Sequence, residues 1–218
     1  MVDPQHDIEI YLEPAAQKTM RVSHIIETHV HADHVSGARR LAEATGAPIF
    51  MHQAATVRFA HTDLTDEDQL ELGNVGITVI TTPGHTPDGV SLLVTDRSRA
   101  KEPWFILTGD TLFSGGVGRP DLLGSGAERR LAEQLYDSLG RLLTLPDHLE
   151  IYPAHFGGAA CGKGLSGKPG STIGFERRFN PALQYGSRGE FVRFVLSDLP
   201  PQPPQFAVNR RINVGLTA

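Results

Sequence analysis

Short apolar runs alternate with polar turns along the chain, and this pattern predicts a mixed α/β fold. The runs are too short for long helices and are bounded by glycine, proline or charged residues, as strands are. The predicted strands comprise residues 22–28, 48–52, 75–82, 89–96, 104–110 and 149–155.

Apolar residues at helical spacing predict helices between some of these strands. Ser36 can cap a helix that ends at Gly46, because glycine tolerates the left-handed conformation at a helix end. Ser125 and Glu128 have the spacing of a capping box, and a leucine stripe follows them over residues 131–145.

The remaining segments are polar, glycine-rich or proline-rich. Residues 53–73 are acidic and predict a helical turn and loop, and the glycine-rich residues 156–174 predict a long loop. Ser187 can cap a last short helix. Residues 199–218 begin with several prolines, which favour an extended tail. We therefore predict one domain over residues 1–198 and a tail over 199–218.

Composition narrows the function classes. The chain has 218 residues, with 20 lysines and arginines against 25 aspartates and glutamates, a formal net charge of −5. This charge gives no support to binding of nucleic acid or of an acidic membrane surface. No apolar run is long enough for a membrane helix, and the polar start is unlike a signal peptide. One cysteine, Cys161, excludes an internal disulfide, so a cytoplasmic location is the default expectation.

The histidines and aspartates that follow the predicted strands suggest metal chemistry. The run from His29 to His34 places three histidines and Asp33 within six residues. His85, Asp110 and His155 each lie at or just beyond the end of another predicted strand. Several strands that end along one sheet edge would bring such loops together. Imidazole and carboxylate ligands together suit zinc, iron or manganese.

These motifs resemble the metallo-β-lactamase superfamily. The resemblance is carried by THVHADH at 28–34, PGHT at 83–86, GD at 109–110 and the later His155. It implies an αββα sandwich with the metal at the sheet edge, here apparently without the first N-terminal strands of the family. Further segments resemble the persulfide dioxygenase branch, the ETHE-type sulfur dioxygenases and bacterial fusions with rhodanese. The most specific of them is YPAHFGGAACGKGLSGKPGSTIGFERRFNPAL, which begins at Tyr152.

The resemblance to that branch implies one non-heme Fe²⁺ held by His29, His85 and Asp110. It also implies oxidation of glutathione persulfide, or of a related thiol persulfide, by O₂ to sulfite and thiol. Two imidazoles and one carboxylate would leave about three coordination positions open. The surrounding polar side chains would orient the ligands or would form a second metal site with Asp110. Those side chains are His31, Asp33, His34 and His155.

A dinuclear site, or zinc in place of iron, would instead suit a thioesterase of the hydroxyacylglutathione hydrolase type. A metal-binding remnant without activity is a third reading. A separate rhodanese and a second copy of the chain are the protein partners we expect.

Three residues are candidates for catalytic roles: Cys161, Arg119 and Lys163. Cys161 is either a small buried residue or a thiol close to the iron, with its pKa lowered by Lys163. Arg119 forms a salt bridge with Asp121 or faces a carboxylate of the substrate. The histidines outside these motifs are interpreted as ordinary surface or core residues.

Overall fold

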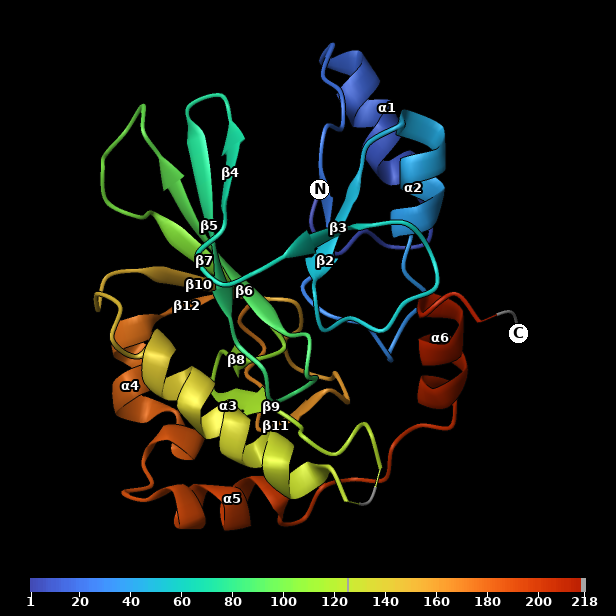
Figure 1. Ribbon diagram of the computed structural model, residues 1–218. Helices are drawn as coiled ribbons and strands as arrows, with labels where there is room; N and C mark the ends of the chain where they lie inside the picture. The colour runs from blue at the N-terminus through green and yellow to red at the C-terminus, as the bar shows by residue number, and fades with distance from the viewer. Residues whose placement is uncertain (125, 217–218) are drawn as a thin grey trace. The chain divides into compact units, whose positions relative to one another are not determined.

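The structure is a computed structural model that describes residues 1–124 and 126–216. The chain forms two compact units. The first comprises Met1–Leu64 and Pro203–Ala218, and the second comprises Thr65–Gln202. Figure 1 shows the first unit in blue and teal with its red C-terminal helix, and the second in green to orange.

The first unit contains a small sheet and flanking helices. Its elements are α1 (Glu9–Gln17), β1 (Ile25–Ile26), α2 (Ala38–Thr45), β2 (Ile49–His52), β3 (Thr62–Leu64) and α6 (Gln205–Asn213). The three strands pair in parallel in the order β1-β2-β3. Its core consists of buried aliphatic side chains that include Ile25, Leu41 and Ile49.

Asparagines of α6 fix the loop that follows β1. Asn213 Nδ2 donates to the carbonyl oxygens of His31 at 2.9 Å and His34 at 2.8 Å. Asn209 Nδ2 donates to the carbonyl oxygen of Ala32 at 3.0 Å. These bonds satisfy backbone groups of an irregular loop, which would otherwise be costly to bury. The histidine-rich loop is therefore held by the last helix of the chain.

The second unit is built on a six-stranded sheet. Its larger elements are β4 (Gln69–Leu72), β5 (Val75–Thr81), β6 (Val90–Asp96), β7 (Phe105–Gly109), α3 (Glu128–Leu142), β10 (Glu150–Pro153) and α5 (Arg188–Leu196). Its shorter elements are β8 (Leu112–Phe113), β9 (Gly116–Gly118), β11 (Gly162–Lys163), β12 (Ser171–Thr172), α4 (Ile173–Phe179) and the 3₁₀ helix η1 (Pro181–Leu183). The large sheet has the order β12-β10-β7-β6-β5-β4, and β11, β9 and β8 form a second, small sheet.

The register of the large sheet aligns the ends of three strands. β5 and β7 both pair antiparallel with β6, so they run in the same direction. β10 pairs with β7 in parallel. The carboxyl ends of β5, β7 and β10 therefore lie along one edge of the sheet, and the loops that leave them begin there.

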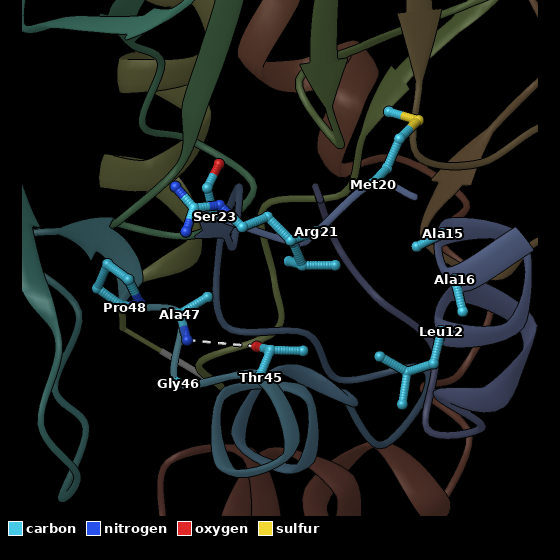
Figure 2. A pocket seen from close by; sticks show the side chains of 11 residues that line it. Leu12, Ala15, Ala16, Met20, Arg21, Ser23, Thr45, Gly46, Ala47 and Pro48 are labelled. Atoms are coloured by element: carbon cyan, nitrogen blue, oxygen red, sulfur yellow. Dashed lines mark hydrogen bonds between the residues drawn. The ribbon is translucent and has the colours of Figure 1, made fainter. Parts of the chain in front are cut away.

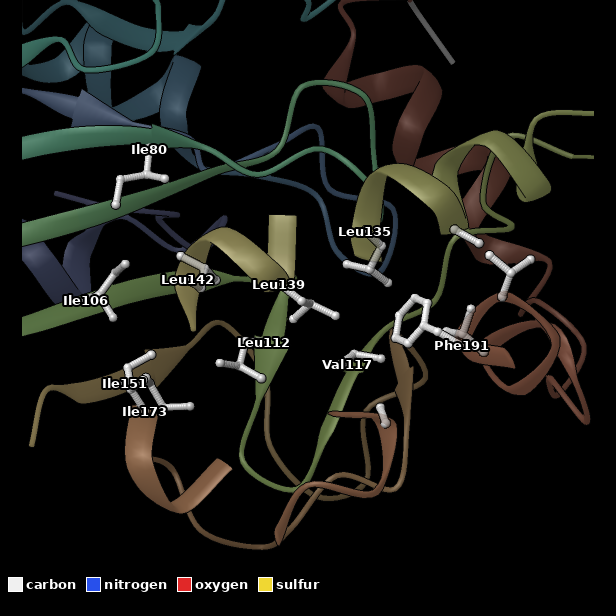
Figure 3. Close-up of a cluster of buried hydrophobic side chains, with 14 of the residues drawn as sticks. Ile80, Ile106, Leu112, Val117, Leu135, Leu139, Leu142, Ile151, Ile173 and Phe191 are labelled. Carbon is white, nitrogen blue, oxygen red and sulfur yellow. The ribbon is translucent and has the colours of Figure 1, made fainter. Parts of the chain in front are cut away.

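A continuous apolar core lies under this sheet (Figure 3). Leu135, Leu139 and Leu142 of α3 pack with Ile106 of β7 and Ile151 of β10. The leucines recur every three or four residues, so one face of α3 is apolar and buried. A rigid sheet and helix thus support the loops at the strand ends.

Most predicted elements are confirmed. The strands predicted over 48–52, 75–82, 89–96, 104–110 and 149–155 correspond to β2, β5, β6, β7 and β10. The helix before Gly46 is α2, and Gly46 has a left-handed φ of 71°. Ser187 caps α5 by accepting a hydrogen bond from the backbone N–H of Glu190. The strand predicted over 22–28 is shorter, and the capping role of Ser125 lies outside the described residues.

Three loop predictions were wrong. Residues 53–73 contain β3 and β4, and the polar side chains of β4 belong to an edge strand with one partner, β5. The predicted loop over 156–174 contains β11 and β12 and the start of α4. The tail predicted as extended contains the helix α6, which begins at Gln205. The last proline of the segment, Pro204, is the N-cap of this helix, so no proline interrupts the helix itself. The C-terminal segment also belongs to the first compact unit, while the predicted boundary at residue 198 stays a prediction.

Candidate metal centre

His85 follows β5 at the sheet edge, after the turn Pro83-Gly84. Its ring is buried, and Nδ1 lies 2.8 Å from the backbone carbonyl oxygen of Arg119. A carbonyl oxygen can only accept, so Nδ1 carries the proton and Nε2 carries the lone pair. The neutral tautomer that binds a metal through Nε2 is therefore fixed by the backbone.

Asp110 directly follows β7, where Gly109 has a positive φ of 50° that turns the chain. The Asp110 side chain is buried, and its Oδ2 lies 3.3 Å from Nε2 of His85. Its Oδ1 accepts a hydrogen bond of 2.7 Å from Nδ1 of His155, two residues beyond β10. The carboxylate thus has one oxygen held by His155 and the other beside the donor nitrogen of His85.

The second unit therefore gathers three of the predicted residues at one edge. His85, Asp110 and His155 follow β5, β7 and β10, whose carboxyl ends are aligned. Gly118 of β9 lies against them: a Cβ atom there would be 1.9 Å from the carbonyl oxygen of Asp110 and 3.0 Å from the Cβ of His85. Only glycine fits this position.

The donor atoms in the second unit suit a divalent metal. A neutral imidazole nitrogen and a carboxylate oxygen stand 3.3 Å apart, close enough to bind one ion together. Both side chains are nearly inaccessible to water, so a metal would balance the buried carboxylate charge. The outer hydrogen bonds to Arg119 and His155 are of the kind that orient metal ligands.

His29 lies in the first unit and is oriented through Thr28. The Thr28 hydroxyl donates to Oδ2 of Asp3 at 2.9 Å and lies 3.0 Å from Nδ1 of His29. Because its one proton goes to the carboxylate, the hydroxyl accepts from His29. Nδ1 of His29 is then protonated, and Nε2 is its donor nitrogen. Asp3 also accepts from the backbone N–H of Thr28 at 2.7 Å.

His31 is held differently, between two carboxylates. Its Nε2 lies 3.1 Å from Oδ1 of Asp3 and 3.3 Å from Oε2 of Glu27. Burial alone would lower the pKa of His31, but the charges of Asp3 and Glu27 and the hydrogen bonds to them raise it well above its usual value. Burial raises the pKa of Glu27, whereas His31 and Thr28 overcome the effect of burial and lower that of Asp3.

Asp33 and His34 complete the loop in the first unit. Asp33 Oδ2 lies 3.0 Å from Nδ1 of His34, and both side chains are partly exposed. One potential ligand atom from each of His31, Asp33 and His34 lies within 4.8 Å of the others. The binding of one ion by His29 together with His85 and Asp110, which belong to the other unit, stays a prediction. A second site with Asp33, His34 and His155 also stays a prediction.

The residues assigned catalytic roles have clear structural partners. Arg119 is 1% exposed and forms two hydrogen bonds with Asp121, at 2.7 and 2.8 Å, which confirms the salt bridge. Cys161 is 1% exposed, as expected for a small core residue. Lys163 Nζ donates to the carbonyl of Ser197 at 3.2 Å and lies 5.2 Å from the Phe194 ring centroid. Their catalytic roles stay predictions.

Two of the cavities differ in their relation to these residues. A cavity of about 210 Å³ in the second unit is lined by Arg119 and Lys163 together with glycines of β9. A larger one in the first unit, of about 560 Å³, is lined by α1, by residues 20–23 and by residues 45–48 at and after the C-terminal end of α2 (Figure 2). Its lining includes Leu12, Ala15 and Met20 and none of the predicted site residues.

Several polar residues that hold the histidine loop were not among the site residues predicted from the sequence. Asp3, Glu27, Thr28 and Asn213 orient it, although Asp3 and Asn213 lie far from it in the sequence. A local signal existed for Glu27 and Thr28, which are polar residues at the end of an apolar strand. The spacing of Asn209 and Asn213 by four residues would have placed both on one helix face.

Comparison with known proteins agrees with this geometry. Residues 2–155 match the metallo-beta-lactamase superfamily, and the chain belongs to that family. It also has that family's fold. Over its whole length it is similar to the crystal structure of a metallo-beta-lactamase from Staphylococcus aureus subsp. aureus COL, with 32% identity and a TM-score of 0.91. The chain spans 65% of the length of that protein.

Two relatives of this chain carry the names of two different enzyme activities. The mitochondrial persulfide dioxygenase ETHE1 of Bos taurus is 30% identical over 90% of this chain and 71% of its own length. A hydroxyacylglutathione hydrolase of Idiomarina loihiensis is 32% identical over 71% of this chain and 55% of its own. The chain is thus a homologue of persulfide dioxygenases and also of a group of hydrolases.

In the described part of the chain, no helix is long and apolar enough to cross a membrane.

Proposed function

We propose that this protein is a mononuclear iron persulfide dioxygenase that acts on glutathione persulfide or a related thiol persulfide. The observation that carries the proposal is the hydrogen bond from Nδ1 of His155 to Oδ1 of Asp110, at 2.7 Å. It engages one oxygen of the carboxylate and leaves the other beside His85. Because Oδ1 is held by His155, a second metal bridged through both carboxylate oxygens would have to displace that bond, and this arrangement favours a single ion.

The extent of similarity supports the same choice. The persulfide dioxygenase relative aligns with 90% of this chain, whereas the hydrolase relative aligns with 71%. The longer alignment extends beyond residues 2–155, the part shared by the superfamily as a whole. The residues after His155 therefore favour the dioxygenase.

His29, His85 and Asp110 would hold the ion, and they fit this role through their tautomers. Nδ1 of His85 donates to the Arg119 carbonyl and Nδ1 of His29 to Thr28, so each offers a neutral Nε2. With one carboxylate the ligand set has a charge of about −1, so a divalent ion keeps a positive charge that attracts R–S–S⁻. A ferrous ion would supply open coordination positions and the redox electrons that O₂ chemistry requires.

The proposed reaction is R–SSH + O₂ + H₂O → R–SH + SO₃²⁻ + 2 H⁺. The outer sulfur is oxidised to sulfite, the S–S bond breaks, and the thiol leaves with the inner sulfur. The residues of the chain would bind the metal ion and orient its ligands. The buried positions of His85 and Asp110 restrict water near the reacting sulfur, and His155 holds the Asp110 carboxylate in place.

The alternative is a dinuclear hydrolase of the hydroxyacylglutathione type. One observation favours it: Asp33 and His34 lie together in the loop, with ligand atoms within 4.8 Å of each other and of one from His31. With His155 and Asp110 they would provide a second site, and zinc could occupy both. A metal-bound hydroxide would then attack a thioester carbonyl.

Two measurements on the full chain separate these functions. We expect the iron-loaded protein to contain about one iron per chain, and to consume O₂ and release sulfite when given glutathione persulfide. S-Lactoylglutathione should not be hydrolysed by the same sample or by the zinc-loaded form. About two metals per chain together with thioester hydrolysis would replace the dioxygenase by the hydrolase. A folded, iron-loaded sample that performs neither reaction would contradict both.

A further inference from the structure

The two proposed ligands of the second unit follow strands that are not neighbours in the sheet. His85 follows β5 and Asp110 follows β7, and β6 lies between these strands. The pairing of β6 with β7 ends at Leu92 and Leu107, before the chain reaches Asp110. The backbone hydrogen bonds between these strands therefore do not extend to the two ligand loops, and other contacts must set the distance between them.

Three buried hydroxyl groups connect the two loops beyond that point. Thr82 directly follows β5, and Ser91 lies in β6. Thr111 directly follows Asp110, and its hydroxyl donates to Thr82, with its oxygen 3.1 Å from Oγ1 and 3.3 Å from the carbonyl oxygen. Oγ1 of Thr82 lies 3.0 Å from Oγ of Ser91. These three side chains form a hydroxyl relay between the segment before one ligand and the residue after the other.

The relay is not explained by stability alone. Thr82 and Ser91 are 0% exposed and Thr111 is 2% exposed, so each hydroxyl has given up contact with water. A buried hydroxyl needs a partner, whereas apolar side chains of the same shape on both sides of such a bond are often equally stable. Hydrogen bonds differ from apolar contacts because they fix the distance and direction between the groups that they join.

Each ligand loop is also fixed locally. In the turn that carries Asp110, the backbone N–H of Thr111 donates to the carbonyl of Thr108 at 3.0 Å. In the other loop, the hydroxyl of Ser138 on α3 donates to the carbonyl of Pro83 at 2.7 Å. Because each loop holds its own shape, the relay between them acts on the position of one loop relative to the other.

We propose that the hydroxyl relay positions His85 and Asp110 at the separation that binds a metal ion. Nε2 of His85 and Oδ2 of Asp110 already stand 3.3 Å apart. Ligands that are held in place in advance bind more tightly, because binding does not have to order them. This inference rests on these two residues being ligands, as in the proposed function, but not on the identity of the metal or of the reaction.

The test measures the affinity of the full chain for Co²⁺ alone, by competition with a chelator of known affinity. Thr111→Val keeps the shape of the side chain and removes the hydroxyl, and we expect the affinity to fall about 10- to 100-fold. Thr111→Ser keeps the hydroxyl and should restore the affinity to within about threefold of the wild type. The visible absorption of bound Co²⁺, which reports its coordination geometry, should change in Thr111→Val and not in Thr111→Ser.

Thr172→Val is the matched control for lost stability. Thr172 caps α4 by accepting a hydrogen bond of 3.2 Å from the backbone N–H of Phe175. Its replacement should lower the midpoint of urea denaturation and leave the Co²⁺ affinity and spectrum unchanged. An equal loss of affinity in this control would mean that the effect follows from stability, and would overturn the inference. A folded Thr111→Val chain with wild-type affinity and spectrum would overturn it as well.

A triple variant decides the matter if Thr111→Val does not fold. It combines Thr82→Val, Ser91→Ala and Thr111→Val, so no hydroxyl of the relay is left buried without a partner. We expect this variant to show the same 10- to 100-fold loss of Co²⁺ affinity, again about the size of an outer-shell effect. Wild-type affinity in the triple variant would overturn the inference.

The outcome is distinguishable from that of the proposed function. A wild-type chain that binds metal but consumes no O₂ with glutathione persulfide, combined with weakened binding in Thr111→Val, rejects the dioxygenase and retains the relay. A wild-type chain that oxidises the persulfide, combined with unchanged Co²⁺ binding in Thr111→Val, retains the dioxygenase and rejects the relay.

Discussion

The two units of this protein hold a buried histidine in opposite ways. In the second unit, Nδ1 of His85 meets a single backbone carbonyl, that of Arg119, at 2.8 Å. In the first unit, Nε2 of His31 meets two carboxylates at 3.1 and 3.3 Å. Both rings are almost completely inaccessible to water. Because Nε2 of His85 also lies 3.3 Å from one carboxylate oxygen, Oδ2 of Asp110, the two rings differ in the number and placement of the carboxylates around them and not in burial.

The comparison shows how the partner determines what a histidine can do. The carbonyl of Arg119 accepts the Nδ1 proton of His85, so Nε2, which lies 3.3 Å from Oδ2 of Asp110, is the nitrogen presented to a metal. Two carboxylates favour the protonated ring, and they raise the pKa of His31 well above its usual value. Two residues of the same type in motifs of similar appearance are thus prepared for different roles.

The largest effect is expected from removal of a ligand in the second unit. His85→Ala or Asp110→Ala should reduce bound iron from about one per chain to almost none, because each takes away a proposed ligand. Elemental analysis of the purified, dialysed protein measures this. His148→Ala, at an exposed position without motif context, is the matched control and should retain iron. Full iron retention in either ligand variant would remove His85 and Asp110 from the centre.

The next largest effect is a loss of folding stability on replacement of Arg119, whose backbone carbonyl orients His85. Arg119→Met breaks a buried ion pair with Asp121 and the bonds from the guanidinium to the carbonyls of Ala160 and Pro200. Removal of one member of such a pair costs about 3 kcal/mol in the free energy of unfolding. Urea denaturation measures the loss, and Arg97→Met, at an exposed pair with Glu71, serves as the control.

The same ion pair predicts a pH dependence of that loss. Burial would raise the pKa of Asp121, but the Arg119 guanidinium outweighs it and holds this pKa below its usual value near 4. A depressed carboxyl pKa contributes stability that is present above the usual value and disappears as the pH falls through the folded-state pKa. The difference between wild type and Arg119→Met should therefore shrink below about pH 4. A difference that stays constant down to pH 2 would contradict the ion-pair explanation.

A smaller effect is expected in the first unit, where a hydroxyl orients the ligand. Thr28→Val keeps the shape of the side chain but removes the link between Asp3 and His29. Loss of such an outer hydrogen bond weakens metal binding by about 10- to 100-fold. Competition with a chelator of known affinity measures the change. Thr78→Val, whose hydroxyl bonds only to Gln69 in the described residues, should leave affinity unchanged. Equal affinities in the two variants would mean that Thr28 does not orient His29.

The sequence predicted the sheet of the second unit well because its signals are local. β5, β6 and β7 are apolar runs with turn residues at their ends, and His85 and Asp110 follow those ends directly. The neutral tautomer of His85 could not be predicted, because it depends on the carbonyl of Arg119, which is 34 residues away in the chain.

The sequence predicted the first unit less well because its stabilising contacts are distant. Asp3, near the start of the chain, contacts His31, and the loop is held by Asn213 from the other end of the chain. The helix that carries Asn213 was not predicted, because the prolines just before it favour extended structure in that segment. Local pattern identifies the candidate ligands, but the selection among them depends on tertiary contacts.

The smallest effect on metal binding is expected at Cys161, because its side chain is not one of the proposed metal ligands. The thiol is buried beside the strand pair of β9 and β11, and its carbonyl accepts from the backbone N–H of Arg119 at 2.9 Å. Cys161→Ser keeps that backbone bond, so His85 should keep its partner, and iron content should stay within about twofold of the wild type. A change in the rate of persulfide oxidation at unchanged iron content would indicate that the thiol contacts the substrate. Loss of iron in this variant would mean instead that Cys161 belongs with the residues that hold the metal.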